Sequence, residues 1–137
     1  MHIGWIQVLE VRNYRTLSWT PAARLNVLSG PNAQGKTNLL EALAVLLTGR
    51  SFRTPRLAEI ARWGTDAASV AGEFVRAGAS RTIRRTIRRL EDGTWQAAGE
   101  SCEWARAIAF GWQDLEIVNG APAVRRNFID GFTARLY

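Results

Sequence analysis

An eight-residue segment, residues 30–37, constrains this chain more than any other part of it. The segment is Gly-Pro-Asn-Ala-Gln-Gly-Lys-Thr and matches the pattern G-x-x-x-x-G-K-[ST]. A short apolar run precedes it, and leucines at helical spacing follow it, with Gly49 as the expected end of the helix. A strand, a glycine-rich loop and a helix in this order predict a phosphate-binding loop, or P-loop.

The residue types in this segment suit a chain of phosphate groups. Glycines let successive amide N–H groups converge on an anion, and the start of a helix adds the positive end of a dipole. Lys36 is expected to reach β- and γ-phosphates, which makes it a candidate catalytic residue, and the Thr37 hydroxyl is expected to ligate Mg²⁺. The residues expected to bind the ligand are Gly30, Pro31, Asn32, Ala33, Gln34, Gly35, Lys36, Thr37 and Asn38.

Charge is the second informative property of the chain. Eighteen basic residues against twelve acidic ones give a formal net charge of +6 and an isoelectric point near 10.9. A basic surface attracts polyanions, of which nucleic acid is the commonest. An ordinary basic protein with an arginine-rich composition is the alternative. Lys36 is the only lysine in the sequence, which indicates a position where arginine does not serve.

Composition excludes several classes of protein. The chain has no uninterrupted apolar run of about 18 residues, and no signal peptide is apparent at its start, so we expect a soluble, cytoplasmic protein without membrane contacts. Cys102 is the only cysteine and has no partner at metal-ligand spacing, so we expect a packed thiol. With 137 residues, 47% of them hydrophobic, the chain is expected to build a single domain around one core.

Periodicity and turn residues predict the remaining elements. Strands are expected at 3–11, 17–19, 24–29, 68–77 and 105–110, and helices at 36–48, 56–63, 113–118 and 122–136. Residues 81–90 contain Arg-Thr-Ile-Arg twice, and their apolar spacing by itself fits a helix. The β-branched residues and the Glu91-Asp92-Gly93 turn favour a hairpin, which we predict.

The densest basic stretch lies between residues 76 and 89, which contain six arginines. Arginines bind the phosphate backbone of DNA with a strong dependence on salt, and nothing here is typical of a helix that reads bases. A solvated basic hairpin is the alternative. The candidate DNA-binding residues are Arg84, Arg85, Arg88 and Arg89.

Several segments resemble a known family. Residues 28–42, Leu-Ser-Gly-Pro-Asn-Ala-Gln-Gly-Lys-Thr-Asn-Leu-Leu-Glu-Ala, look like the ABC-type ATPases of the SMC/Rad50/RecF group. The continuation Thr-Gly-Arg-Ser-Phe-Arg-Thr at 48–54 is similar to the RecF family in particular, and residues 9–15, 110–115 and 120–130 resemble further RecF segments in the same order. Trp112 departs from the pattern, because it stands where the family usually has proline.

The resemblance implies an α/β fold of the P-loop NTPase class, similar to lobe I of an ABC ATPase. Such a lobe consists of a strand, the P-loop and a helix, together with antiparallel β-hairpins and carboxy-terminal helices. Residues 1–137 would form the amino-terminal portion, lobe I, of a RecF-like ATPase domain. The arm, the signature loop and the Walker B half of that domain are absent from the 137 residues.

The function implied by the resemblance is that of the ATP-binding lobe of an ATPase in DNA replication and recombinational repair, with ATP and Mg²⁺ as cofactors. In the family, the protein binds DNA at single-strand/double-strand gaps, cooperates with RecO and RecR to load recombinase, and forms an ATP-dependent homodimer. Whether this chain is itself an enzyme stays open. The alternative is a non-catalytic module that binds ATP or DNA without hydrolysis.

The resemblance also implies roles for residues outside the P-loop. Arg12 is expected to approach phosphate or adenine, with a solvated turn as the alternative. Gln113 is expected to touch Mg²⁺ and the attacking water as a second candidate catalytic residue, with a surface helix cap as the alternative. Arg50 and Arg53 are expected in a loop that faces a partner or DNA, or in a simple arginine-rich loop. Glu41 is expected to anchor its helix locally.

Overall fold

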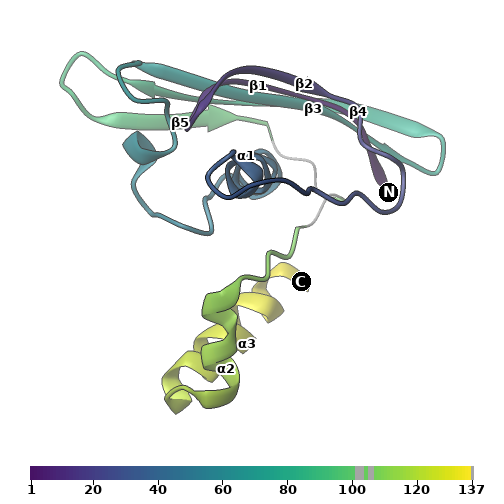
Figure 1. Cartoon of the computed structure of the whole chain (residues 1–137), viewed down its shortest axis with the longest axis vertical. Coiled ribbons are helices and arrows are strands. Elements are labelled where there is room, and N and C mark those ends of the chain that lie inside the picture. Colours follow the sequence, from purple (N-terminus) through teal and green to yellow (C-terminus); the bar gives the residue numbers. More distant parts are fainter. Residues whose placement is uncertain (101–103, 105–106, 137) are drawn as a thin grey trace. The chain divides into compact units, whose positions relative to one another are not determined.

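A computed structural model describes residues 1–100, 104 and 107–136 of the chain. They form two compact units, Met1–Ala107 and Ile108–Tyr137. The elements of the first unit, coloured purple to green in Figure 1, are β1 (His2–Val11), β2 (Tyr14–Trp19), α1 (Lys36–Thr48), the 3-10 turn η1 (Leu57–Glu59), β3 (Ala67–Arg76), β4 (Ala79–Arg89) and β5 (Trp95–Gly99).

The strands of the first unit form one antiparallel sheet in the order β2-β1-β3-β4-β5, and α1 lies against one face of it (Figure 1). Alternation along β1 and β3 turns one set of apolar side chains toward the helix. Among these, Ile6, Val8, Val70 and Phe74 are fully buried. The sheet and the helix after the P-loop confirm the predicted α/β class.

Strand β4 confirms that the Arg-Thr-Ile-Arg repeat belongs to a hairpin. Residues 77–78 join β3 to β4 with φ angles of 50° and 81°, as in the tight turns that match the twist of a sheet. At the other end, Asp92 Oδ1 accepts a hydrogen bond from the Thr94 amide, and the chain returns as β5. Ile83 and Ile87 are buried on the helix side. Their spacing of four is even, so it suits a strand as well as a helix.

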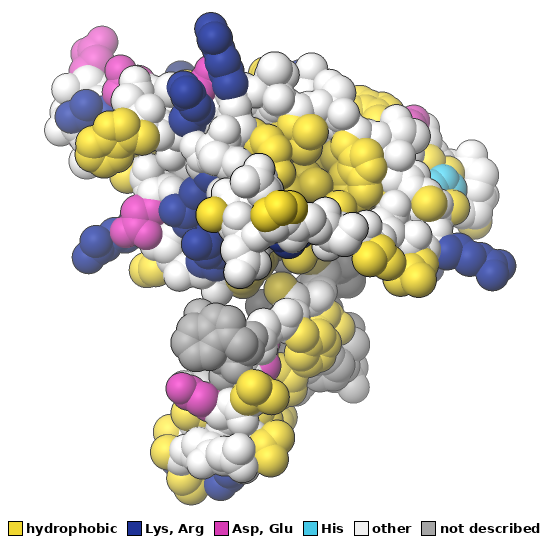
Figure 2. Space-filling view, viewed as in Figure 1, with side chains coloured by type: hydrophobic (Ala, Val, Ile, Leu, Met, Phe, Trp, Pro, Cys, Tyr) yellow, Lys and Arg dark blue, Asp and Glu magenta, His cyan; other side chains and the backbone are white. Residues whose placement is uncertain are grey.

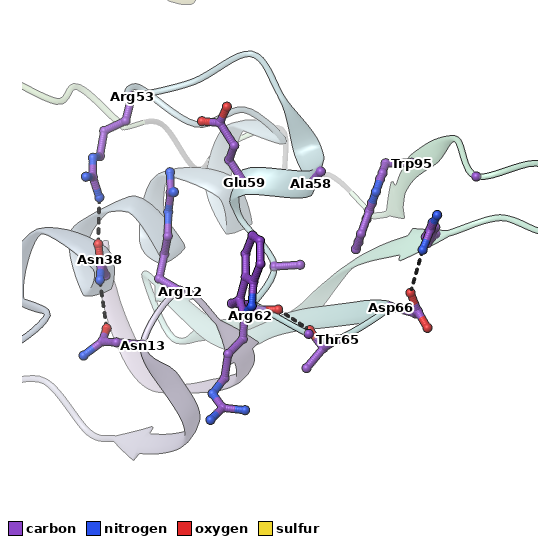
Figure 3. Close-up of a pocket in the computed structure, with 15 residues that line it drawn as sticks. Arg12, Asn13, Asn38, Arg53, Ala58, Glu59, Arg62, Thr65, Asp66 and Trp95 are labelled. Carbon is purple, nitrogen blue, oxygen red and sulfur yellow. Dashed lines mark hydrogen bonds and ion pairs between the residues drawn. The ribbon is translucent and has the colours of Figure 1, made fainter.

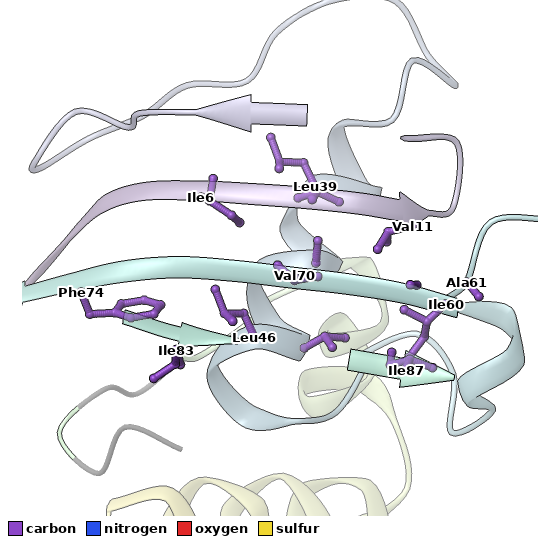
Figure 4. Packing of buried hydrophobic residues seen from close by; sticks show 14 residues of the cluster. Ile6, Val11, Leu39, Leu46, Ile60, Ala61, Val70, Phe74, Ile83 and Ile87 are labelled. Atoms are coloured by element: carbon purple, nitrogen blue, oxygen red, sulfur yellow. The ribbon is translucent and has the colours of Figure 1, made fainter. Parts of the chain in front are cut away.

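The core of the first unit lies between the sheet and α1 (Figure 4). Gly72 of β3 allows the two layers to approach closely. A Cβ at this position would lie 2.9 Å from Leu46 Cδ2 and 2.9 Å from the Trp5 carbonyl oxygen. The buried residues of the cluster are Ile6, Val8, Val11, Leu39, Ala42, Val45, Leu46, Ile60, Ala61, Ala68, Val70, Phe74, Ile83 and Ile87.

The strand predicted at 24–29 is wrong. These residues form no strand, and Leu25 and Val27 are 79% and 77% exposed. A strand requires a neighbour for its backbone hydrogen bonds, and none of the described strands pairs with this segment. A local closure forms instead. The Asn26 side-chain amide donates to the Ala22 carbonyl, and its oxygen accepts from the Ala22 amide.

The helix predicted at 56–63 is also wrong beyond its first turn. Only η1 is helical, and Ala61 then pairs with Val11 as an antiparallel bridge. Backbone pairing with the end of β1 takes the place of further helix here. Arg12 N–H donates to the Ile60 carbonyl, and Arg62 N–H donates to the Glu10 carbonyl. The helical spacing of the apolar residues therefore reflected the burial of Ile60 and did not indicate a longer helix.

The second unit contains η2 (Trp112–Leu115), α2 (Glu116–Asn119) and α3 (Pro122–Leu136). The helix predicted at 122–136 is confirmed, and the one predicted at 113–118 is divided between η2 and α2. The strand predicted at 105–110 is wrong for residues 107–110, which are irregular, while residues 105 and 106 and Cys102 lie outside the described residues. Among the residues described, no helix is both long and apolar enough to cross a membrane.

Packing of α1 on the sheet predicts unequal effects of two leucine substitutions. Leu46 has no exposed surface, whereas Leu40 on the same helix is 50% exposed. Leu46→Ala should lower the free energy of unfolding by about 2–5 kcal/mol, because it removes buried methyl groups and leaves a cavity. Leu40→Ala should cost less than about 1 kcal/mol. Urea denaturation of both variants measures the difference, and equal losses would contradict the described core.

Candidate functional site

The predicted P-loop curls through backbone conformations that few residues adopt. Gly30, Ala33 and Gly35 have φ angles of 142°, 63° and 101°. Glycine tolerates such values without a steric penalty, whereas Ala33 is strained, and strained non-glycine residues cluster at binding sites. The curl brings the loop back over the start of α1.

The start of α1 leaves backbone donors available at the P-loop. The first helical hydrogen bond runs from the Leu39 amide to the Gly35 carbonyl at 2.9 Å, so the amides just before Leu39 have no partner within the helix. The Gly35 N-cap makes no side-chain cap, and the first turn contains no acidic residue. Thr37 is exposed in this turn. Amides of this kind, at the positive end of the helix dipole, can bind an anion.

The Lys36 ammonium braces the loop. Its Nζ donates to the carbonyl oxygens of Gly30 at 2.8 Å and Pro31 at 2.6 Å. An ammonium has three donors, so one remains after these two bonds. Lys36 therefore joins the start of α1 to the first two residues of the loop, and its charge lies within the segment where the motif predicts phosphate.

The β1–β2 turn supports the loop from the other side. The Tyr14 hydroxyl donates to the Gly35 carbonyl at 3.1 Å, and Asn13 Nδ2 donates to the Gln34 carbonyl at 3.4 Å. A Cβ on Gly35 would lie 2.6 Å from Asn13 Nδ2 and 2.9 Å from the Tyr14 hydroxyl. Gly35 is thus required by its φ angle and by this close approach.

Arg12 and Glu41 form the central ion pair of the site. Arg12 Nε donates to Glu41 Oε2 at 2.8 Å and Arg12 Nη2 donates to Oε1 at 2.7 Å, a bidentate arrangement. The Glu41 side chain is fully buried, and that of Arg12 is 20% exposed. Arg12 has a φ of 52°, so its backbone is held in the left-handed region beside this pair.

The loop after α1 reaches the same carboxylate. The Ser51 hydroxyl donates to Glu41 Oε1, and Arg53 Nη1 lies 3.3 Å from Oε2. Burial by itself would raise the pKa of Glu41. The hydrogen bonds from Arg12 and Ser51 and the charges of both arginines outweigh burial and lower the pKa below its usual value. Glu41 therefore stays ionised in the interior, and it anchors three segments rather than its own helix alone.

A cavity of about 980 Å³ opens beside these groups (Figure 3). Arg53 Nη1 donates to Asn38 Oδ1 at 2.7 Å, and Asn38 Nδ2 donates to Asn13 Oδ1 at 2.8 Å, along the dashed line at the left of the figure. Arg12 stands next to this line and lines the same cavity. Trp95 lines the cavity on the side opposite these residues.

The structure brings together some predicted site residues and separates others. Asn38, Arg12 and Arg53 line one cavity, and the P-loop is joined to its lining by the hydrogen bond from Asn13 to the Gln34 carbonyl. Gln113 belongs to η2 in the second unit, so its role toward Mg²⁺ stays a prediction. Arg50 borders a separate cavity of about 580 Å³ formed by the loop after α1.

The four candidate DNA-binding arginines occupy both faces of β4. Arg84 and Arg88 are exposed on the face turned away from α1, since the buried Ile83 and Ile87 alternate with them. On the helix side, Arg85 Nε donates to the Leu46 carbonyl at 3.3 Å, near the end of α1. Arg89, on that same side, pairs with Asp66 at 3.6 Å. The four therefore do not present one common surface.

Sequence reasoning missed the support network around the loop. It gave no role to Asn13 or Tyr14 as loop supports, and it expected only a local role for Glu41. A signal was present, because Glu41 is an acidic residue on the otherwise apolar face of α1 formed by Leu39, Ala42 and Val45. A charge in such a position indicates a buried partner.

The lowered pKa of Glu41 predicts how stability depends on pH. A carboxyl group whose pKa is lower in the folded state contributes stability above its unfolded pKa, about 4.3 for Glu, and loses it as pH falls through the folded value. Glu41→Gln should reduce the free energy of unfolding at pH 6. The difference from the wild type should narrow as pH falls below about 4.3. Urea denaturation at several pH values measures it, and two parallel curves would contradict the ionised state of Glu41.

Comparison with known proteins extends over nearly the whole chain. Residues 6–127 match the family described as AAA domain. The chain is 39% identical over 139 residues to the DNA replication and repair protein RecF of Myxococcus xanthus, covering 95% of this chain and 36% of the relative. Its identity to the RecF protein of Oceanobacillus iheyensis is 35% over 136 residues, covering 95% and 37%.

A solved structure shares the fold. The recombination mediator protein RecF with ATP, of the RecFOR pathway, matches with a TM-score of 0.77 and 25% sequence identity, covering 95% of this chain and 38% of that one. The chain spans little more than a third of the length of the curated relatives it matches. Its P-loop, sheet and helix agree with these comparisons, and the chain therefore belongs to the AAA domain family, as a RecF-like member with a P-loop NTPase fold.

Proposed function

We propose that this chain is the ATP-binding lobe of a RecF-like ATPase of DNA replication and repair. The observation that carries the proposal is the P-loop itself, with its curled backbone, the free amides at the start of α1 and the Lys36 ammonium bonded to its first two residues. The similarity to the RecF structure with ATP supports the same ligand. In this assignment the three phosphates lie along the loop.

In this proposal the loop binds the phosphates of the nucleotide, and the cavity binds its nucleoside. Lys36 meets the β- and γ-phosphates, and the exposed Thr37 hydroxyl supplies a hard oxygen ligand of the kind that Mg²⁺ prefers. The adjoining cavity, of about 980 Å³, has room for the nucleoside. Asn38 and Arg12 line it on one side, with the indole of Trp95 as an apolar surface opposite.

Replacement of the P-loop lysine tests nucleotide binding. Lys36→Ala should abolish measurable binding of Mg·ATP in calorimetry, because it removes the compact positive charge from the phosphate site. Lys36→Arg should restore binding only in part, since a planar guanidinium does not fit the space of an ammonium.

Circular dichroism should show both Lys36 variants folded, because the side chain contacts only two loop carbonyls. Arg24→Ala is a control that removes a positive charge from the exposed segment before the P-loop. Unchanged affinity in Lys36→Ala would overturn the proposed function.

DNA is the second proposed ligand, and the outer face of the sheet is the surface we assign to it. Arg84 and Arg88 project from this face, four strand positions apart, among the hydroxyl side chains of Thr82 and Thr86. Such a set contacts phosphates and sugars rather than base edges. Figure 2 shows basic side chains in several separate groups on its visible face. The total charge therefore does not identify the DNA-binding surface, and the positions of the arginines on the sheet have to do so.

Two double variants of equal charge distinguish the faces of β4. Arg84→Gln with Arg88→Gln should weaken binding to duplexes of any sequence and flatten the dependence of log K on log salt, by about 0.9 for each DNA phosphate that an arginine no longer neutralises. Arg85→Gln with Arg89→Gln should leave that slope unchanged, because these side chains bond the end of α1 and Asp66. Equal slopes for both pairs, measured by fluorescence anisotropy, would contradict the assignment.

We assign the remaining family properties to the whole protein of which such a lobe is part. These are ATP-dependent dimerisation, Mg²⁺-assisted hydrolysis, cooperation with RecO and RecR at gaps in DNA, and a cytoplasmic location. Their support is membership of a family whose curated relatives are DNA replication and repair proteins and whose solved structure is described as part of the RecFOR pathway.

A further inference from the structure

Glu41 is the one fully buried charged side chain among the residues that the structure describes. An ionised carboxylate in the interior is costly unless hydrogen bonds and opposite charges compensate it. A single arginine in bidentate contact supplies that compensation in many proteins. Here the carboxylate receives a second arginine and a hydroxyl as well, from a different segment of the chain. Each carboxylate oxygen thus accepts two hydrogen bonds, and the four donors come from both ends of the sequence that flanks α1.

Both arginines also face the cavity beside the P-loop. Arg12 and Arg53 line it, and their side chains are 20% and 39% exposed. Glu41 binds Nε and Nη2 of Arg12, which leaves Nη1 for another acceptor. Arg53 uses Nη1 for Glu41 and Asn38, which leaves Nε and Nη2. Each guanidinium is therefore fixed on one side and has donors available on the other.

The same carboxylate is connected to the loop through side chains. Arg53 donates to Asn38, Asn38 donates to Asn13, and Asn13 donates to the Gln34 carbonyl of the P-loop. Asn38 and Glu41 lie one turn apart on α1, so both hold Arg53 from the same side of the helix. Movement of Arg53 would remove the first bond of this series.

We propose that Glu41 is a positioning residue for the nucleotide, which holds Arg12 and Arg53 at the cavity wall and, through Asn38 and Asn13, keeps the P-loop in place. This inference rests on the proposed ATP binding. Glu41 itself touches no phosphate and acts through the two arginines. The ligand chemistry that it serves is an anion, or an acceptor-rich base, at the border of loop and cavity.

The sign of one charge effect separates positioning from general stabilisation. Glu41 is a negative charge near the site of an anionic ligand, so its removal without loss of geometry should strengthen ATP binding. If Glu41 positions the arginines, Glu41→Gln should instead weaken ATP binding, by about tenfold, the range for loss of hydrogen bonds from charged groups. A purely structural role would lower stability and leave the affinity of the folded protein unchanged or higher.

Glu91→Gln is the matched control. Glu91 is exposed in the turn between β4 and β5, and it does not belong to the lining of the cavity. The substitution makes the same change in net charge without releasing an arginine of the network. It should leave ATP affinity unchanged or slightly increased.

The experiment is calorimetric titration of the full chain with Mg·ATP, at a temperature where circular dichroism shows each variant folded. Glu41→Gln and Arg53→Gln are each measured alone and then together. A positioning role predicts that the loss caused by Glu41→Gln shrinks when Arg53 is already replaced, because the two changes remove one interaction. Glu41→Asp keeps the charge but shortens the side chain, so it should bind ATP less tightly while remaining folded. It is the test to use if Glu41→Gln does not fold.

The outcomes are distinct. Weaker ATP binding in Glu41→Gln or Glu41→Asp, with coupling to Arg53, and no weakening in Glu91→Gln support the proposal. Wild-type affinity in the folded Glu41 variants, while Lys36→Ala does not bind, overturns it and leaves the proposed function intact. Absence of ATP binding by the wild-type chain overturns both.

Discussion

A buried carboxylate has to be compensated wherever it occurs, and that requirement organises the first unit of this protein. Glu41 lies within the apolar face of the helix that follows the P-loop, and its charge is met by Arg12 from the end of β1 and by Ser51 and Arg53 from the loop after α1. Three segments that are distant in the sequence are thereby tied to one point. The P-loop ends four residues before that point, so its surroundings are fixed by the same interaction.

Prediction from sequence succeeded where the determinants are local. The P-loop conformation follows from glycine positions and from the helix start, and the β4–β5 hairpin follows from β-branched residues and a turn with Asp92 and Gly93. The strand predicted at 24–29 failed because a strand depends on a neighbour, and the alternation of Leu25 and Val27 says nothing about whether one is present. The helix predicted at 56–63 failed because pairing of Ala61 with Val11 is a long-range contact.

The candidate site shows the same division between local and long-range information. The glycine-rich loop before α1 was predictable from its motif, and the binding of phosphate by its residues stays a prediction. The support around Glu41 was not, because an acid on an apolar helix face predicts a partner but not which of 17 arginines it is. The arginines of β4 illustrate a further limit. Their density indicated a basic surface, yet strand geometry sends Arg84 and Arg88 to one face and Arg85 and Arg89 to the other. The number of arginines in a strand does not show how they are distributed between its two faces.

The Lys36 side chain has a consequence for how a ligand enters the site. Because its ammonium bonds the Gly30 and Pro31 carbonyls, the loop has an internal cation that keeps it curled. If the loop binds an anion, as proposed, its conformation is preorganised, and this would reduce the conformational entropy lost on association. Lys36, the one lysine of the sequence, would then both stabilise the loop and contact the ligand.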